Sequence, residues 1–224
     1  MMTSKKTNWL IAPMLALTLS GAAYADSWDV RYESTDGIIA TTSGTQNGYL
    51  TGAMTFVNTQ GSSFEAFCVE LAQGHAPSSA GFLSYTKGSF TIQQEGLLQS
   101  LFSSSYVSVS TAEQKAAFQV AVWKIMEETS PAAKFDLSGG SFQFWYLSET
   151  STQAQDASFA ALANSYLLAA SNYSGPAQYQ LTKLVNGTYQ DFVVANPVPE
   201  PETYALLLAG LGAVGLVVRR RRVH

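Results

Sequence analysis

Residues 111–128, TAEQKAAFQVAVWKIMEE, carry the strongest helical pattern in this 224-residue chain. Apolar residues recur at helical spacing and Pro131 follows closely, so the pattern predicts a helix over 111–128. Ser110 is expected to cap its start, with Glu113 completing a capping box. Between residues 118 and 126 almost no polar face remains, which places the middle of this helix in the protein core.

The segments on either side of this helix alternate between strand and helix patterns. Strands are expected in 28–57, with turns at Asp36-Gly37 and Asn47-Gly48, and in 64–71, 82–92 and 142–147; helices in 97–102 and 152–171; and a final hairpin in 179–194 that turns at Asn186-Gly187. Strands, then helices, then strands indicate an α+β fold: an antiparallel β-sandwich or barrel-like sheet with a helical insertion.

The N-terminus has the pattern of a cleavable secretory signal. Lys5 and Lys6 precede an apolar stretch over 9–19, and Ala23-Tyr24-Ala25 forms a small-x-small cleavage site. Residues 1–25 are therefore predicted to be a signal helix that signal peptidase removes. The mature domain is expected to occupy 26–197.

The C-terminus, 198–224, has three parts in order. These are Pro199, Glu200 and Pro201; a 15-residue apolar segment at 204–218; and a cluster of four arginines, Arg219, Arg220, Arg221 and Arg222. The apolar segment is expected to form a hydrophobic transmembrane helix, with the arginines as a stop signal on the cytoplasmic side. This tail would anchor the domain transiently in the inner membrane.

The order of these parts resembles the PEP-CTERM sorting signal. The resemblance implies that an exosortase-type membrane protease removes the tail near the motif. It also implies a Gram-negative, polysaccharide-producing bacterium and a final location at the cell surface or in the extracellular matrix.

Charge is unevenly distributed along the chain. Half of the 12 basic residues lie in the two terminal segments, so 26–197 holds six basic and 14 acidic residues, a net charge near −8. An acidic surface repels phosphate backbones, which argues against nucleic-acid binding.

Two residues of the central domain could react with each other. Cys68 is the one cysteine, so it cannot form an internal disulfide, and Gln119 lies in the buried part of the central helix. A buried amide without a partner costs about 1–3 kcal/mol, so Gln119 must be hydrogen-bonded or chemically altered. If the strand of Cys68 packs on the helix, its sulfur could displace ammonia from the amide and leave an internal thioester.

The sequences around both residues support this interpretation. Phe67-Cys68-Val69-Glu70 and, downstream, Phe118-Gln119-Val120-Ala121-Val122-Trp123 resemble the two motifs of the bacterial thioester domain family. The resemblance assigns Cys68 and Gln119 to the thioester. Trp123, one helical turn beyond Gln119, would shield the bond from water or simply pack in the core.

These features predict a binding module and not a turnover enzyme, with no cofactor and no metal. It would capture an amine-bearing surface protein or polysaccharide covalently. The main alternative is a structural protein of the biofilm matrix with an inert, buried Cys68. A cysteine hydrolase using Cys68 and His75 is a third reading, but no Asn or Asp motif completes such a site.

Overall fold

Seven strands and three α-helices make up most of the computed structural model, which describes residues 27–45, 48–199 and 209–211. The elements are β1 (Ser27–Thr42), β2 (Tyr49–Asn58), β3 (Ser63–Cys68), β4 (Leu83–Gly88), α1 (Ile92–Ser105), α2 (Ala112–Glu127), β5 (Phe144–Tyr146), α3 (Gln153–Asn172), β6 (Tyr179–Val185) and β7 (Phe192–Pro197). Three short 3₁₀ helices lie at Ser78–Ala80, Tyr106–Ser108 and Pro131–Ala133.

The strands form an antiparallel sheet that closes on itself. Their order is β2-β3-β7-β6-β4-β1-β5, and β2 also pairs with β1, so six strands complete a ring to which β5 is attached. Closure pairs the backbone groups that an open sheet would leave exposed at its edges. The expected α+β class with a barrel-like antiparallel sheet is confirmed.

Strand β1 is long because it contributes to three pairings. Its first residues pair with β4, its middle with β2, and Thr41 and Thr42 with β5. The turn expected at Asp36-Gly37 is wrong, since β1 runs straight through it. Gly37 faces Gly52 across the β1–β2 pair, and a Cβ on either glycine would collide with the backbone of the other strand. The two glycines therefore allow a close approach of strands and not a reversal of the chain.

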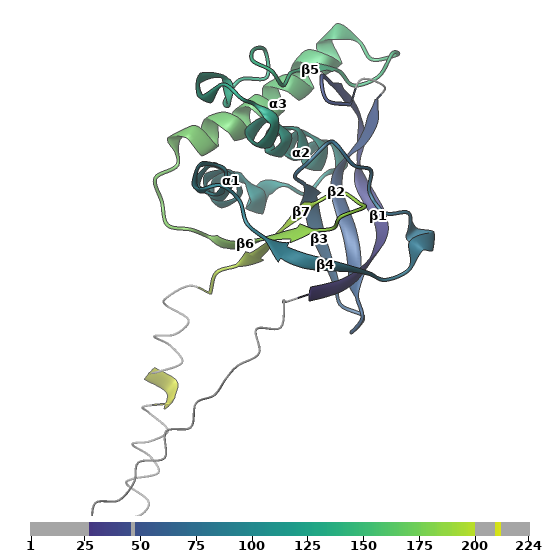
Figure 1. Cartoon of the computed structure of the whole chain (residues 1–224). Coiled ribbons are helices and arrows are strands. Elements are labelled where there is room, and N and C mark those ends of the chain that lie inside the picture. Colours follow the sequence, from purple (N-terminus) through teal and green to yellow (C-terminus); the bar gives the residue numbers. More distant parts are fainter. Residues whose placement is uncertain (1–26, 46–47, 200–208, 212–224) are drawn as a thin grey trace, which may run out of the picture.

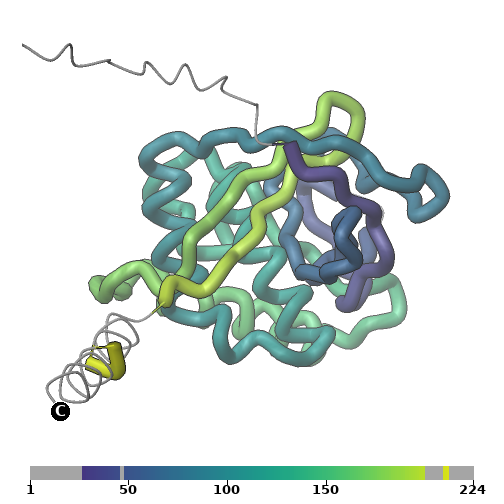
Figure 2. Tube along the Cα trace, turned by 90° about the horizontal axis from the view of Figure 1, so that it is seen from below, coloured from purple at the N-terminus to yellow at the C-terminus, as the bar shows by residue number. Residues whose placement is uncertain are grey.

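The helices lie together on one side of the barrel, as Figure 1 shows. Helix α2 is buried along Ala116–Ile125 and packs against β1, β2 and β3 as well as against α1 and α3. Figure 2 shows the molecule turned by 90° and seen from below, with the β6–β7 hairpin running across the near face beside the purple start of β1. Because α2 lies between the sheet and the other two helices, its middle is buried on all sides, which explains the apolar residues around its whole circumference.

The start of α2 differs from the expectation by one residue. Thr111, and not Ser110, is the N-cap, and its hydroxyl accepts a hydrogen bond from the Gln114 backbone N–H. The Gln114 side-chain oxygen accepts in return from the Thr111 N–H at 3.1 Å. Gln114 therefore takes the place predicted for Glu113, and the capping-box principle itself holds.

Several sequence predictions fall on other parts of the chain. The signal peptide, Glu200, Pro201 and the arginine cluster lie outside the described residues, and the apolar segment 204–218 is described only at 209–211. None of the helices within the described ranges has the length and apolar character needed to cross a bilayer.

Candidate functional site

The structure brings Gln119 and Cys68 into direct contact. The backbone N–H of Cys68 donates to Oε1 of Gln119 at 2.8 Å, and Nε2 of Gln119 donates to the Cys68 carbonyl oxygen at 2.8 Å. Both residues are buried, with 1% of Gln119 and 2% of Cys68 exposed. The buried amide therefore has its partners, and the two residues singled out in the sequence form one unit.

This contact exists because the sheet opens locally beside Cys68. The β2–β3 ladder ends at the pair Met54–Ala66, although two residues further the same register would bring Gly52 opposite Cys68. Gly52 is paired only on its other side, with Gly37 of β1. Every second residue of a strand directs its backbone N–H and C=O to the same edge of that strand. Cys68 comes two residues after Ala66, the last residue paired with β2, so its N–H and C=O face the gap that β2 leaves. The Gln119 amide fills this gap and replaces the missing strand.

Aromatic packing next to both residues fixes their relative position. The rings of Phe67 and Phe118, each one residue before a member of the pair, lie 5.0 Å apart. Phe102 of α1 contacts both rings at 6.0 and 5.0 Å, and Tyr106 contacts them at 5.8 and 5.6 Å. These buried contacts join β3 to α1 and α2, so the register of Cys68 against Gln119 is set by the core.

The surroundings of the Cys68 sulfur favour the protonated thiol over the thiolate. Its thiol donates to the carbonyl oxygen of Glu70 at 2.6 Å. Burial raises the pKa of the Cys68 thiol to about 12; Trp123 and the Glu70 backbone partly oppose the rise, and the carboxylates of Glu70 and Glu127 add to it. An unmodified Cys68 is therefore a neutral thiol at physiological pH.

Trp123 lies beside this sulfur, as its spacing from Gln119 predicts. It is 1% exposed, and its ring meets that of Tyr49 edge to face at 6.1 Å. Among the buried side-chain nitrogen and oxygen atoms of the described residues, Trp123 Nε1 is the one with no hydrogen-bond partner. Its N–H is nevertheless close enough to Cys68 to lower the pKa of that thiol.

A small cavity joins these residues to further polar groups, of which the sequence had suggested His75 alone as a neighbour of Cys68. Its volume is about 10 Å³, at the lower limit for one water molecule. The lining includes Cys68, Gln119 and Trp123, and it also includes Tyr49, His75 and Gln190. The spacing of these residues in the sequence gives no sign of their convergence, because each comes from a different strand or loop.

Gln190 links the polar side of the cavity to the sulfur. This residue is 2% exposed in the loop before β7. Its Nε2 donates to the Glu70 carbonyl oxygen at 3.2 Å, the same oxygen that accepts from Cys68. Its Oε1 accepts from the Tyr49 hydroxyl at 3.5 Å. The chain of contacts from Tyr49 to Cys68 is therefore continuous.

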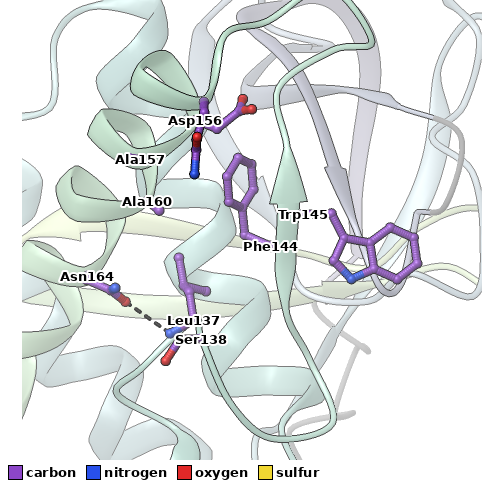
Figure 3. A pocket seen from close by; sticks show the side chains of 9 residues that line it. Leu137, Ser138, Phe144, Trp145, Asp156, Ala157, Ala160 and Asn164 are labelled. Carbon is purple, nitrogen blue, oxygen red and sulfur yellow. Dashed lines mark hydrogen bonds between the residues drawn. The ribbon is translucent and has the colours of Figure 1, made fainter.

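A larger cavity lies elsewhere, between α3 and the segment 137–145. Its volume is about 420 Å³, and neither Cys68 nor Gln119 contributes to its lining. Figure 3 shows Phe144 facing Asp156 of α3, whereas Trp145 points away on the other side of β5. Asn164 is occupied by a hydrogen bond from the Leu137 N–H at 3.0 Å. This cavity is separate from the candidate site.

Within the described residues, no group of three or more His, Cys, Asp or Glu side chains is arranged to hold a metal ion. The chemistry that the site offers is that of a thiol, a carboxamide and their hydrogen-bonding neighbours. Of the sorting residues, Pro199 alone lies in the described part, where it is exposed beyond the end of β7.

Comparison with known families identifies the tail. Residues 197–222 match the PEP-CTERM protein-sorting motif. No curated protein matches the chain. The sorting motif predicted from Pro199, Glu200, Pro201 and the arginine cluster is thus confirmed.

Solved structures provide neighbours for the domain. They include the N-terminal thioester domain of the fibronectin-binding protein SfbI from Streptococcus pyogenes (11% identity, 77% of this chain and 94% of that chain, TM-score 0.45). The N-terminal domain of the S. pyogenes pilus tip adhesin Cpa (14%, 76% and 98%, 0.42) and the N-terminal thioester domain of a Clostridium perfringens surface protein (11%, 77% and 99%, 0.44) are also similar. The chain therefore carries a PEP-CTERM sorting motif behind a domain whose structural neighbours are thioester domains of bacterial surface proteins.

Proposed function

We propose that this protein is exported to the cell surface and captures an amine-bearing partner covalently through an internal thioester between Cys68 and Gln119. The observation that carries the proposal is the paired hydrogen bond, 2.8 Å in each direction, between the Gln119 amide and the Cys68 backbone. It holds the amide beside the residue whose sulfur would attack it, and such positioning can supply about 7–11 kcal/mol of the barrier.

The contacts suit each step of thioester formation. Attack requires the Cys68 sulfur to leave the Glu70 carbonyl oxygen and reach the Gln119 amide carbon by rotation about its Cα–Cβ bond. The Cys68 N–H already donates to Oε1, the atom on which negative charge develops during the attack. The Cδ–Sγ bond forms, the Cδ–Nε2 bond breaks, and the thiol proton leaves with the nitrogen as ammonia.

The product would be a protected electrophile. The cavity beside it has room for one water molecule at most, and Trp123 and Tyr49 cover it. An amine of the partner attacks Cδ of Gln119, an amide bond forms, and Cys68 is released as a thiol. Each molecule acts once, so the proposed protein is a binding module and not a turnover enzyme.

Export and final location follow from the tail. The sorting motif supports processing by an exosortase-type protease and release of the domain at the surface of a Gram-negative cell. The amine could belong to a surface protein or to an amino-sugar polymer. If the protein acts in the biofilm matrix, the covalent bond to its partner would form in the space between cells.

Intact mass measurement of the full chain, under conditions that unfold it, tests the proposal. The thioester makes the protein lighter by one ammonia, and methylamine treatment then adds one methylamine and exposes one thiol. Cys68→Ala and Gln119→Ala should show neither change. Titration of the native thiol does not discriminate, because an unmodified Cys68 is buried and protonated as well. A full-mass protein with a free thiol after unfolding contradicts the proposal and favours the inert structural role.

A further inference from the structure

His75 lies at the cavity that contains Cys68 and Gln119. It belongs to the loop between β3 and β4 and is the one histidine in the described part of the chain. Its side chain is half-buried, so it has contact with both the site and the solvent. Nothing in the thioester unit itself requires an imidazole at this position.

The imidazole is held in one orientation. Its ring stacks on Tyr32 of β1 with centroids 4.5 Å apart and an angle of 30° between the planes. Nδ1 lies 2.9 Å from the carbonyl oxygen of Ala76, which can only accept a hydrogen bond. Nδ1 therefore carries the proton in the neutral ring, and Nε2 is left as a free base.

The other titratable groups around the ring are poorly suited to exchange protons. Tyr32, Tyr49 and Cys68 surround it from β1, β2 and β3. Burial raises the pKa of Tyr49, with the neighbouring Cys68 adding to the rise, so its phenol stays protonated at neutral pH. In the loop before β7, the Asp191 carboxylate is paired with Lys183 at 3.2 Å.

Two acids remain near the sulfur, Glu127 at the end of α2 and Glu70 on the segment after β3. Burial raises the pKa of the Glu127 carboxylate, Glu70 adds to the rise, and Glu127 does not line the cavity. Glu70 is closer in the chain to Cys68. Its backbone oxygen, and not its carboxylate, is the group that accepts from the Cys68 thiol. Burial raises the pKa of the Glu70 carboxylate, and Asp191 adds to the rise. The carboxylate is not part of the cavity lining, whereas His75 is.

Opening of a thioester at this site creates a proton-transfer problem. The attacking amine must lose a proton, and the departing sulfur must gain one. Because burial raises the pKa of the Cys68 thiol to about 12, departure as a bare thiolate is costly. One group that accepts the first proton and supplies the second would solve both parts.

We propose that His75 transfers this proton: Nε2 takes it from the amine nitrogen that attacks Cδ of Gln119 and returns it to Sγ of Cys68 as the Cδ–Sγ bond breaks. The N–Cδ bond forms, the Cδ–Sγ bond breaks, and nothing is oxidised or reduced. This inference rests on the proposed thioester. It makes His75 a catalytic residue for capture, so the partner amine reacts fastest when the imidazole is neutral.

The test uses the full chain and its His75→Asn variant, in which the asparagine amide can still donate to the Ala76 carbonyl oxygen but offers no base at the Nε2 position. Opening is followed by intact mass with methylamine and with hydroxylamine, whose nitrogen is unprotonated near neutral pH. We expect His75→Asn to open about 100-fold more slowly, in the range typical of a lost general base. The same slowing is expected with both nucleophiles, since neither supplies a base at the Nε2 position.

Two further variants keep the inference falsifiable. Ser79→Ala, an exposed change in the same loop, should open at the wild-type rate. His75→Ala should be slow but accelerated by added imidazole, which a packing defect would not show. Equal opening rates in wild type and His75→Asn, with the thioester present in both, overturn the role of His75 alone. A wild-type chain without the ammonia loss overturns the thioester itself and this inference with it.

Discussion

Lys124 and Glu128 form an ion pair inside the core, at the C-terminal end of the helix that carries Gln119. Nζ and Oε2 are 2.8 Å apart, and both side chains are fully buried. Nζ also donates to the carbonyl oxygens of Gly139 and Phe142 at 2.6 and 2.7 Å. The pair thus attaches the end of α2 to the segment that follows it.

Removing the cation from this pair should destabilise the domain strongly. Lys124→Met leaves Glu128 and two carbonyl oxygens without their buried donor, a loss of about 3–5 kcal/mol in the free energy of unfolding. Urea denaturation followed by circular dichroism measures it. The double variant Lys124→Met/Glu128→Leu should recover part of the loss, because it leaves no unpaired charge.

An exposed pair provides the control for this experiment. Arg31 and Glu33 are 2.7 Å apart with 41% of each side chain exposed. Arg31→Ala should cost at most about 1 kcal/mol. A loss of that size in Lys124→Met as well would show that the buried pair does not hold α2.

Acid should weaken the same region. Desolvation favours the neutral form of Glu128, but hydrogen bonds from Lys124 and from the backbone N–H groups of Ser130 and Phe142 outweigh it and hold the pKa well below its ordinary 4.5. The lowered pKa contributes stability above pH 4.5 that is lost as the pH falls. Urea midpoints between pH 6 and 2 should therefore fall less steeply in Glu128→Gln than in wild type; parallel curves would refute this assignment.

The Gln119 amide should stabilise the fold even where no thioester can form. In a Cys68→Ala background, Gln119→Leu removes the partners of the residue 68 N–H and C=O. Each buried group left unpaired costs about 1–3 kcal/mol. Thermal and urea unfolding of the two proteins give the difference. An unchanged stability would mean that water or a shifted strand replaces the amide.

A free thiol at position 68 should react only at high pH. In Gln119→Ala, where no thioester forms, burial holds the pKa of Cys68 near 12. Alkylation by iodoacetamide, read by mass, should be slow in the native protein at pH 8 and faster above pH 10. The same protein in urea should react readily at pH 8. Equal native and unfolded rates at pH 8 would show that the sulfur is accessible.

The sorting motif should control release from the membrane. Glu200→Ala changes the acidic residue between Pro199 and Pro201, within the matched motif. We expect the chain to keep its tail and remain in the membrane fraction of the producing bacterium. Immunoblots of membrane and culture medium, with mass analysis of the C-terminus, measure this. Normal release of the variant would show that the tail is processed without the motif.

The sequence was sufficient to predict the central pair and the general class of fold. Helical periodicity placed Gln119 in the core, and the resemblance of the two motifs to thioester domains paired it with Cys68. The closure of the barrel was harder to foresee, because Asp36-Gly37 has the composition of a turn and its true role depends on Gly52 in another strand. His75 and Gln190 reach the site through loop positions, which periodicity does not reveal.

The last strand of the barrel leads directly into the sorting motif. β7 ends at Pro197, and the Val198 N–H still donates to the Gln178 carbonyl oxygen at 2.9 Å. Phe192, at the other end of β7, pairs with Cys68. Tension on an attached C-terminus would therefore pass along β7 as shear against β3, toward Cys68 and the Gln119 amide hydrogen-bonded to its backbone, the group that would hold a partner captured as proposed. Protease cleavage before Pro197 would remove part of β7. The tail must therefore be cleaved after Pro197 if β7 is to transmit force between the C-terminus and a bound partner.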